Sequence, residues 1–291
     1  MLIREKLQDH KFSNTEKEVV RYVLEQKLAI KNMTIKEIAN ATYAAPSTLL
    51  RIAHKLNYDG WNELKEAYIQ EEEYLQSHFT EIDPNIPFDR SDDIMSISGK
   101  IAKLEIEAIE DSLSLLKYED LQKAVTILQT SKCIHVFGVA DNYKEAETFK
   151  YYMFRINKQV QIHFAQSEMA FAAYMIQPDE CAIAISYTGE TVFLLEPLKT
   201  IKDRGIPIIA ITSIGGNSLS NMADCTLNIS TREKMLTKIA TYVNDTSIGY
   251  ILDVLYSCVF SHEYEKNLKF KLDTSRIIEK NRISTNKVIS E

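Results

Sequence analysis

Apolar residues recur at helical spacing through residues 1–77, with no strand-like run among them. The pattern predicts three helices, which begin at Asn14, Thr34 and Pro46. Asn14 is a favoured helix cap, and Thr34 stands three residues before Glu37, the spacing of a capping box. Proline is favoured in the first turn of a helix, which fits the start at Pro46. We therefore expect residues 1–77 to form an all-α domain.

Helical spacing stops over residues 78–92, which contain two prolines, and returns over residues 93–130. The proline-containing stretch is typical of a linker. The apolar pattern changes again at Cys133, where short continuous apolar runs begin to alternate with helical segments. The five runs are CIHVFG (133–138), QVQIHF (159–164), CAIAIS (181–186), IPIIAIT (206–212) and CTLNI (225–229).

Alternation of apolar strands with helices is typical of a parallel sheet covered on both faces. We predict a multidomain protein with an all-α head and an α/β, doubly wound, five-stranded parallel sandwich. The predicted boundaries are residues 1–77 for the head, 78–92 for the linker and 93–262 for the α/β domain with its leading helices. Residues 263–291 are polar, and we expect a tail with one helix near SRIIEK and a loose end.

Composition excludes some classes of protein. The chain has 45% hydrophobic and 26% charged residues, which is ordinary for a globular protein. A net charge of −7 argues against a broad nucleic-acid-binding surface, although one small basic face on a small domain remains compatible with it. No apolar run approaches the roughly 20 residues of a membrane span, and the N-terminus lacks a signal-peptide core. We expect a cytoplasmic protein with no membrane partner.

The cysteines and histidines show no metal-binding spacing. Cys133, Cys181, Cys225 and Cys258 lie far apart, with no CxxC pair. The six histidines form neither HxxxH nor HExxH. We therefore expect buried, reduced cysteines, no metal site and no cofactor.

The helix that begins at Pro46 has one apolar face and one polar face. Ser47, Arg51 and Lys55 lie on the polar face, with Thr48 beside them. Hydroxyls bind phosphate oxygens or base edges. The Arg51 guanidinium can donate two hydrogen bonds to a guanine, and Lys55 can neutralise a phosphate. Two short helices joined by a tight turn also suit a helix-turn-helix, although a plain amphipathic surface helix has the same pattern. The predicted DNA-contacting residues are Thr34, Ser47, Thr48, Arg51 and Lys55.

Residues 34–65, TIKEIANATYAAPSTLLRIAHKLNYDGWNELK, resemble the N-terminal helix-turn-helix of RpiR-type transcriptional regulators. The positions in register are Thr34, Glu37, Ala39, Thr48, Arg51, Leu56, Gly60, Trp61, Glu63, Leu64 and Lys65. Two positions depart from the family pattern: Ala45 replaces a capping serine, and Asn57 replaces a glycine. Asparagine is tolerated at a left-handed position, whereas the lost cap costs about 1 kcal/mol. The resemblance implies binding to double-stranded operator DNA.

The stretch ISYTGET follows the third predicted strand and precedes a helix that we expect from Glu190 to Arg204. Ser186, Thr188 and Thr191 offer hydroxyls, and Gly189 permits close approach of the backbone. Hydroxyls beside a helix N-terminus suit a phosphate group, although such residues are also ordinary caps of a strand-to-helix turn.

The same stretch resembles the S-x-[ST]-G-x-T signature of SIS domains, with a likeness that runs from about residue 133 to 260. The resemblance implies that Ser186, Thr188, Gly189 and Thr191 bind the phosphate of a phosphosugar. Two features depart from the family: GVADN at 138–142 replaces G-x-G-x-S, and Pro197 should kink the following helix. An acid beside a phosphate is unfavourable unless it faces a sugar hydroxyl or amine, so either the ligand differs from an ordinary phosphosugar, or Asp141 points away from it, or the pocket has lost tight binding. Asn142, followed by Glu145, also suits a helix cap. The predicted effector-binding residues are Asp141, Asn142, Ser186, Tyr187, Thr188, Gly189 and Thr191.

A sugar isomerase needs a base that moves a proton between adjacent carbons. Glu168, Glu190 and Glu233 lie near predicted strand ends, but the sequence pairs none of them with a second acid or base. We therefore predict no catalytic residues and a regulator of sugar metabolism, a homodimer or tetramer whose operator binding responds to a phosphosugar. Residues 78–92 and the helix after them are the expected relay.

Three alternatives remain from the sequence. They are a sugar phosphate isomerase with an accessory head, a regulator with a diverged or inactive pocket, and a protein–protein interaction module.

Overall fold

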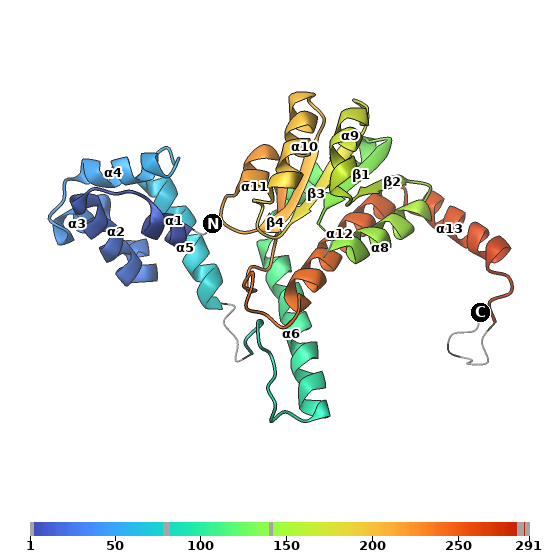
Figure 1. Ribbon diagram of the computed structural model, residues 1–291, viewed down its shortest axis with the longest axis horizontal. Helices are drawn as coiled ribbons and strands as arrows, with labels where there is room; N and C mark the ends of the chain where they lie inside the picture. Colours follow the sequence, from blue (N-terminus) through green and yellow to red (C-terminus); the bar gives the residue numbers. More distant parts are fainter. Residues whose placement is uncertain (1–2, 78–81, 140–141, 284–287, 289–291) are drawn as a thin grey trace. The chain divides into compact units, whose positions relative to one another are not determined.

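The computed structural model describes residues 3–77, 82–139, 142–283 and 288 (Figure 1). It divides into a helical unit that runs to Asp83 and a larger unit that begins at Pro84. None of the described helices is both long and apolar enough to cross a membrane.

The helical unit contains five α-helices and a short 3-10 helix among its described residues. These are α1 (Ile3–Asp9), α2 (Asn14–Gln26), η1 (Lys27–Asn32), α3 (Ile35–Ala41), α4 (Pro46–Lys55) and α5 (Trp61–Ser77). Val19, Ile38, Leu49 and Ile52 are fully buried, and Trp61 packs with them in one core. The apolar stripes of α2, α3 and α4 therefore meet inside the unit, as their periodicity predicts.

The ends of these helices follow capping rules, with one correction to the predicted caps. Ser13, and not Asn14, caps α2: its Oγ accepts from the Glu16 N–H, and the Glu16 carboxylate accepts from the Ser13 N–H at 2.7 Å. The predicted capping box of Thr34 and Glu37 is confirmed. Asn57 has a φ of 65°, the left-handed conformation expected where the family has glycine.

The larger unit is a parallel α/β sandwich, which confirms the predicted fold class. Its strands are β1 (Cys133–Gly138), β2 (Gln159–His163), β3 (Cys181–Ser186), β4 (Ile208–Ser213) and β5 (Cys225–Ile229). Its helices are α6 (Ile94–Leu115), α7 (Tyr118–Thr130), α8 (Tyr143–Phe154), α9 (Gln166–Met175), α10 (Val192–Asp203), α11 (Ser218–Met222), α12 (Tyr242–His262) and α13 (Tyr264–Ile278).

All four strand pairings are parallel, in the order β2-β1-β3-β4-β5 (Figure 1). One face of the sheet packs with α7, α8 and α12, and the other packs with α9, α10 and α11. Every residue of β1, β3 and β4 is buried, which explains their continuous apolar runs. The edge strand β2 alternates instead, and Gln159 and Gln161 are exposed.

Three segments differ from the sequence prediction or extend it. The tail begins with a long helix, α13, rather than one short helix near SRIIEK. Helix α10 begins at Val192, two residues later than predicted, and runs as one helix with Pro197 buried inside it. In the second half of the predicted linker, the Asn85 Oδ1 accepts from the Lys234 N–H at 2.6 Å and the Asn85 carbonyl accepts from the Ile239 N–H. That half of the linker is therefore packed within the larger unit.

Candidate DNA-binding and effector sites

Helix α4 presents a mixed surface rather than one continuous polar face. Ser47, Arg51 and Lys55 are exposed, whereas Thr48 is only 2% exposed and accepts a hydrogen bond from the Arg51 guanidinium at 3.3 Å. Thr48 therefore positions Arg51 through its hydroxyl. Thr34 lies at the start of α3, with its hydroxyl engaged by Glu37.

A residue that the sequence did not single out lies in the turn between α3 and α4. Tyr43 is 99% exposed and has a φ of 50°, an uncommon conformation for an aromatic residue. A large, exposed aromatic side chain therefore lies in the turn that precedes α4. Its signal in the sequence is an aromatic residue inside an otherwise small and polar turn.

The basic residues of α4 share a buried carboxylate from α2. The Glu16 side chain is 3% exposed and lies 2.7 Å from the Lys55 Nζ and 3.9 Å from the Arg51 Nε. Burial alone would raise the pKa of Glu16, but hydrogen bonds from Lys55 and Ser13 outweigh burial and lower that pKa to about 2. The carboxylate is therefore ionised at neutral pH and pairs with both basic residues of α4.

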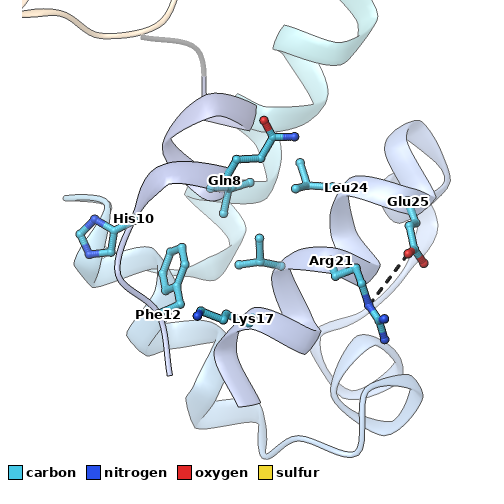
Figure 2. Close-up of a pocket in the computed structure, with 9 residues that line it drawn as sticks. Gln8, His10, Phe12, Lys17, Arg21, Leu24 and Glu25 are labelled. Atoms are coloured by element: carbon cyan, nitrogen blue, oxygen red, sulfur yellow. Dashed lines mark ion pairs between the residues drawn. The ribbon is translucent and has the colours of Figure 1, made fainter. Parts of the chain in front are cut away.

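A cavity of about 370 Å³ opens elsewhere in the helical unit, between α1 and α2 (Figure 2). Leu7, Phe12 and Leu24 line it, and Arg21 pairs with Glu25 along its rim at 4.0 Å. None of the predicted DNA-contacting residues lines this cavity. The cavity nevertheless adjoins the predicted DNA-binding surface, because the Lys55 Nζ lies 5.6 Å from the centroid of the Phe12 ring.

The loop after β3 lies at the topological switch point of the sheet. Strands β1 and β3 are neighbours, but the chain leaves β1 toward β2 on one side and leaves β3 toward β4 on the other. Ligands in such sheets bind beyond the carboxyl ends of the strands at that point. The loops that follow Gly138 and Ser186 therefore flank one position.

Hydroxyls and backbone N–H groups converge in this loop. The buried Ser186 Oγ lies 3.1 Å from the Thr191 Oγ1 and accepts from the Gly189 N–H at 3.2 Å. The Thr188 Oγ1 accepts from the Glu190 N–H at 3.2 Å. Gly189 has a φ of 66°, the left-handed conformation that favours glycine. Together with the N-terminus of α10, the arrangement suits an anion.

Tyr187, also in the predicted set, has a structural contact. Its Oη donates to the Glu233 carbonyl at 2.7 Å and accepts from the Glu233 N–H at 3.0 Å. Burial, with a smaller contribution from the Glu233 charge, raises the pKa of Tyr187 above its usual range. Tyr187 is thus a neutral phenol that fixes the loop to the segment before α12.

The loop after β1 is described only in part, because Asp141 lies outside the described residues. Asn142 is 1% exposed and makes no side-chain hydrogen bond that caps α8. Its Oδ1 accepts instead from the Asn244 Nδ2 at 3.4 Å, and the Asn244 Oδ1 is buried without a hydrogen-bond partner among the described residues. Asn244 is a candidate ligand group that the sequence analysis missed, and it lies in the first turn of α12, next to Asp245.

The three glutamates considered as bases have other surroundings. Glu190 accepts from the Ser218 N–H and Oγ at 2.9 and 2.6 Å, which caps the short helix α11. Glu233 is buried, accepts from the Val243 N–H at 2.7 Å and pairs with the Lys238 Nζ at 3.1 Å. Glu168 is exposed in the first turn of α9. Each of the first two carboxylates is committed to the end of a helix.

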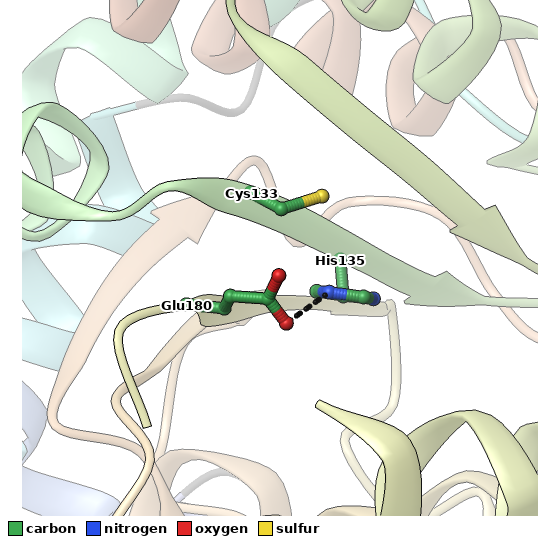
Figure 3. A group of neighbouring side chains, drawn as sticks. All are labelled: Cys133, His135 and Glu180. Carbon is green, nitrogen blue, oxygen red and sulfur yellow. Dashed lines mark hydrogen bonds and ion pairs between the residues drawn. The ribbon is translucent and has the colours of Figure 1, made fainter. Parts of the chain in front are cut away.

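A second polar group lies near the amino ends of β1 and β3 (Figure 3). The His135 Nε2 lies 3.1 Å from the Glu180 Oε2, and the His135 Nδ1 lies 3.0 Å from the His163 Nε2. Burial and the neighbouring His135 lower the pKa of His163 to about 4, and burial also lowers the pKa of His135. The Cys133 Sγ lies beside this chain of side chains. Motif spacing could not find the group because its members come from different strands.

Residues 1–74 match the helix-turn-helix domain of the rpiR family, and residues 127–255 match the SIS domain. The chain is 25% identical over 273 residues to an uncharacterised HTH-type transcriptional regulator of Caldanaerobacter subterraneus subsp. tengcongensis, in a match that covers 94% of this chain and 95% of the relative. It is also 25% identical over 275 residues to the uncharacterised HTH-type transcriptional regulator YbbH of Bacillus subtilis, with the same coverage of both chains.

Solved structures share the fold. The NanR protein of Vibrio vulnificus, complexed with ManNAc-6P, matches with a TM-score of 0.61 and 19% identity over 97% of this chain and all of that one. The sugar isomerase domain of an RpiR transcription factor from Sphaerobacter thermophilus matches with a TM-score of 0.55 and 15% identity over 62% of this chain and 98% of that one. The chain therefore combines an rpiR-family helix-turn-helix with a SIS domain and belongs to the RpiR-type transcriptional regulators.

Proposed function

We propose that this regulator binds operator DNA in the cytoplasm as a dimer and that a phosphorylated sugar at residues 186–191 alters that binding. The observation that supports sensing is the convergence of the Ser186 hydroxyl, the Thr191 hydroxyl and the N-terminus of α10 at the switch point of the sheet. A sugar phosphate occupies this position in the proposal, with its phosphate in the loop and its hydroxyls toward Asn142 and Asn244. The similar solved structure of NanR is a complex with ManNAc-6P, which fits this chemistry.

In this proposal, the SIS domain binds a sugar phosphate but does not convert it chemically. A sugar isomerase needs a free base beside the sugar carbons, and two of the three candidate glutamates are instead committed to helix ends. Curated relatives over nearly the whole chain are named as transcriptional regulators. Turnover of any sugar phosphate by the purified protein would overturn this part of the proposal.

Effector binding is tested with Thr191→Val, which removes a hydroxyl but keeps the shape of the side chain. The Thr191 side chain makes no hydrogen bond that caps α10, so the substitution does not remove a helix cap. We expect at least a roughly tenfold loss of affinity for the sugar phosphate that binds the wild type, because a hydrogen bond to a charged group is removed. The measurement is calorimetry, after a thermal-shift screen of sugar phosphates and inorganic phosphate on the wild type.

Thr200→Val, on the same helix but beyond the loop, is the matched control and should bind as the wild type does. If no sugar phosphate raises the melting temperature of the wild type, the effector part of the proposal fails. Equal affinities for the two variants would exclude Thr191 from the phosphate site.

DNA binding is tested separately with Arg51→Ala. Arg51 is exposed on α4, and its guanidinium is oriented by Thr48 and Glu16. We expect a loss of about tenfold or more in affinity for the DNA upstream of the gene, measured by fluorescence anisotropy at fixed salt. Arg21→Ala on α2 removes the same charge and should change the affinity by less than about twofold. Equal losses in the two variants would mean that α4 does not read the DNA.

A further inference from the structure

The polar group at the amino ends of β1 and β3 contains three side chains of types that bind metal ions. Cys133 and His135 are alternate residues of β1, so their side chains lie on one face of the sheet. Glu180 directly precedes β3, where Cys181 is paired with Ile134 of β1. One donor atom from each of Cys133, His135 and Glu180 lies within 4.8 Å of the other two (Figure 3).

The distances are close to those of a tetrahedral zinc site. Zinc–sulfur bonds of about 2.3 Å and zinc–nitrogen or zinc–oxygen bonds of about 2.0–2.2 Å place neighbouring ligand atoms about 3.3–3.6 Å apart. The His135 Nε2 and the Glu180 Oε2 are already 3.1 Å apart. The widest separation in the group must shrink by only about 1 Å, which rotation about the side-chain bonds of Cys133 and Glu180 can supply.

Groups around the three donors orient them as metal ligands require. The far nitrogen of His135, Nδ1, lies 3.0 Å from the His163 Nε2, so its proton has an acceptor when Nε2 binds a metal. The Glu180 carboxylate is fixed by the Gln177 N–H at 2.8 Å. The Cys133 Sγ makes a weak contact with the Ile134 carbonyl at 3.9 Å.

Burial and access are also compatible with a bound ion. Cys133 and His135 are each 5% exposed, which excludes most water from the donors. The neighbouring residues of edge strand β2, Gln159 and Gln161, are paired in register with Cys133 and His135 and are exposed. Solvent therefore lies beside β1 on the side of β2.

We propose that Cys133 Sγ, His135 Nε2 and the Glu180 carboxylate bind one Zn²⁺ ion, with water as the fourth ligand. Sulfur, imidazole and carboxylate ligands together favour zinc over magnesium or calcium. The ion links β1 to β3 at the amino edge of the sheet. The effector loop lies at the other end of β3, about 20 Å away for six residues of extended strand. The metal site is therefore distinct from the effector site.

The test uses the full-length protein, freed of metal with a chelator and titrated with Co²⁺. We expect one ion per chain and a near-ultraviolet charge-transfer band from thiolate to cobalt, which an equivalent of Zn²⁺ abolishes. Zn²⁺ alone should raise the melting temperature of the wild type. Substoichiometric binding, or binding without the thiolate band, would overturn the proposal in favour of a metal-free chain of hydrogen bonds through Glu180, His135 and His163.

Variants assign the ligands. Cys133→Ser should lose the charge-transfer band, and Glu180→Gln should keep the band but bind Co²⁺ at least tenfold more weakly. Cys258→Ser, which changes a partly exposed cysteine on α12, is the matched control and should behave as the wild type. Persistence of the band in Cys133→Ser, or its loss in Cys258→Ser, would overturn the assignment. If Cys133→Ser does not fold, the affinity of Glu180→Gln decides the result independently.

Discussion

Glu16 is a buried carboxylate of the helical unit with a strongly lowered pKa. Its buried carboxylate receives the Ser13 N–H and the Lys55 ammonium, and its pKa is lowered from 4.5 to about 2 despite burial. A carboxyl group whose pKa is lower in the folded than in the unfolded state stabilises the folded state at pH values above its pKa in the unfolded state. The stabilisation is therefore complete above about pH 4.5 and is lost as the pH falls toward 2.

Glu16→Gln should lower the free energy of unfolding of the helical unit by about 2 kcal/mol at neutral pH, and the difference should shrink below pH 4.5. Urea unfolding followed by the fluorescence of Trp61 measures it, because Trp61 is the single tryptophan of the chain and lies in this core. Glu25→Gln, an exposed carboxyl of the same helix, should change the stability by less than about 0.5 kcal/mol. A constant difference across the acid range would contradict the assignment.

The same carboxylate affects the surface of α4. The Glu16 carboxylate neutralises part of the positive charge of Lys55 and Arg51. We propose that these two side chains contact the phosphates and bases of DNA. Glu16→Gln should therefore bind operator DNA at least about twofold more tightly at low salt, with a steeper dependence on salt concentration. Anisotropy titrations at several salt concentrations measure both. An unchanged slope would mean that Lys55 stays bound within the protein when DNA is present.

At the scale of elements, the strands and the helices α2, α3 and α4 were predictable from the sequence, and the reasons are local. The helices α1, η1 and α5 were not among the predicted ones. Continuous apolar runs mark β1, β3 and β4 because both faces of those strands are buried. The capping box at Thr34 marks the start of α3 through side-chain chemistry within four residues. The loop at Ser186 to Thr191 was also predictable, since its hydroxyl contacts are with near neighbours.

Other elements depend on contacts that the sequence does not display. Helix α13 has few buried residues, and it is joined to α8 through Arg155, which contacts Ser275 and Glu279 at 2.8 Å each. Polar contacts of this kind produce no apolar periodicity in the sequence. The group of Cys133 and Glu180 was missed for a related reason, because strand pairing brings together residues 47 positions apart (180 − 133).

The turn between β3 and α10 depends on one backbone conformation. Gly189→Ala places a Cβ at a φ of 66°, which costs about 1–2 kcal/mol. We expect a lower melting temperature for the larger unit and loss of sugar phosphate binding, both measured by calorimetry. Gly99→Ala, in α6 with no atom within 4 Å of the added Cβ, should be neutral or stabilising. Full effector affinity in Gly189→Ala would show that the loop does not bind the phosphate.

At the scale of the whole molecule, regulation requires that effector and DNA affect each other's affinity equally. Tyr187 connects the effector loop to Glu233, whose carboxylate accepts the Val243 N–H at the start of α12. Tyr187→Phe removes the hydroxyl, so it should leave sugar phosphate binding within about threefold while reducing the effect of the sugar on DNA affinity. DNA titrations with and without sugar phosphate measure the coupling. Unchanged coupling would exclude this connection.

The double hydrogen bond of Tyr187 has a mechanical consequence. Because the phenol contacts both the N–H and the carbonyl of Glu233, a rotation of the loop cannot occur without a shift of that peptide segment. Glu233 in turn caps α12, and α12 packs along α6, the first helix after the predicted linker. A shift of the loop after β3 would therefore be passed to the first turn of α12, whose 21 residues pack against α6.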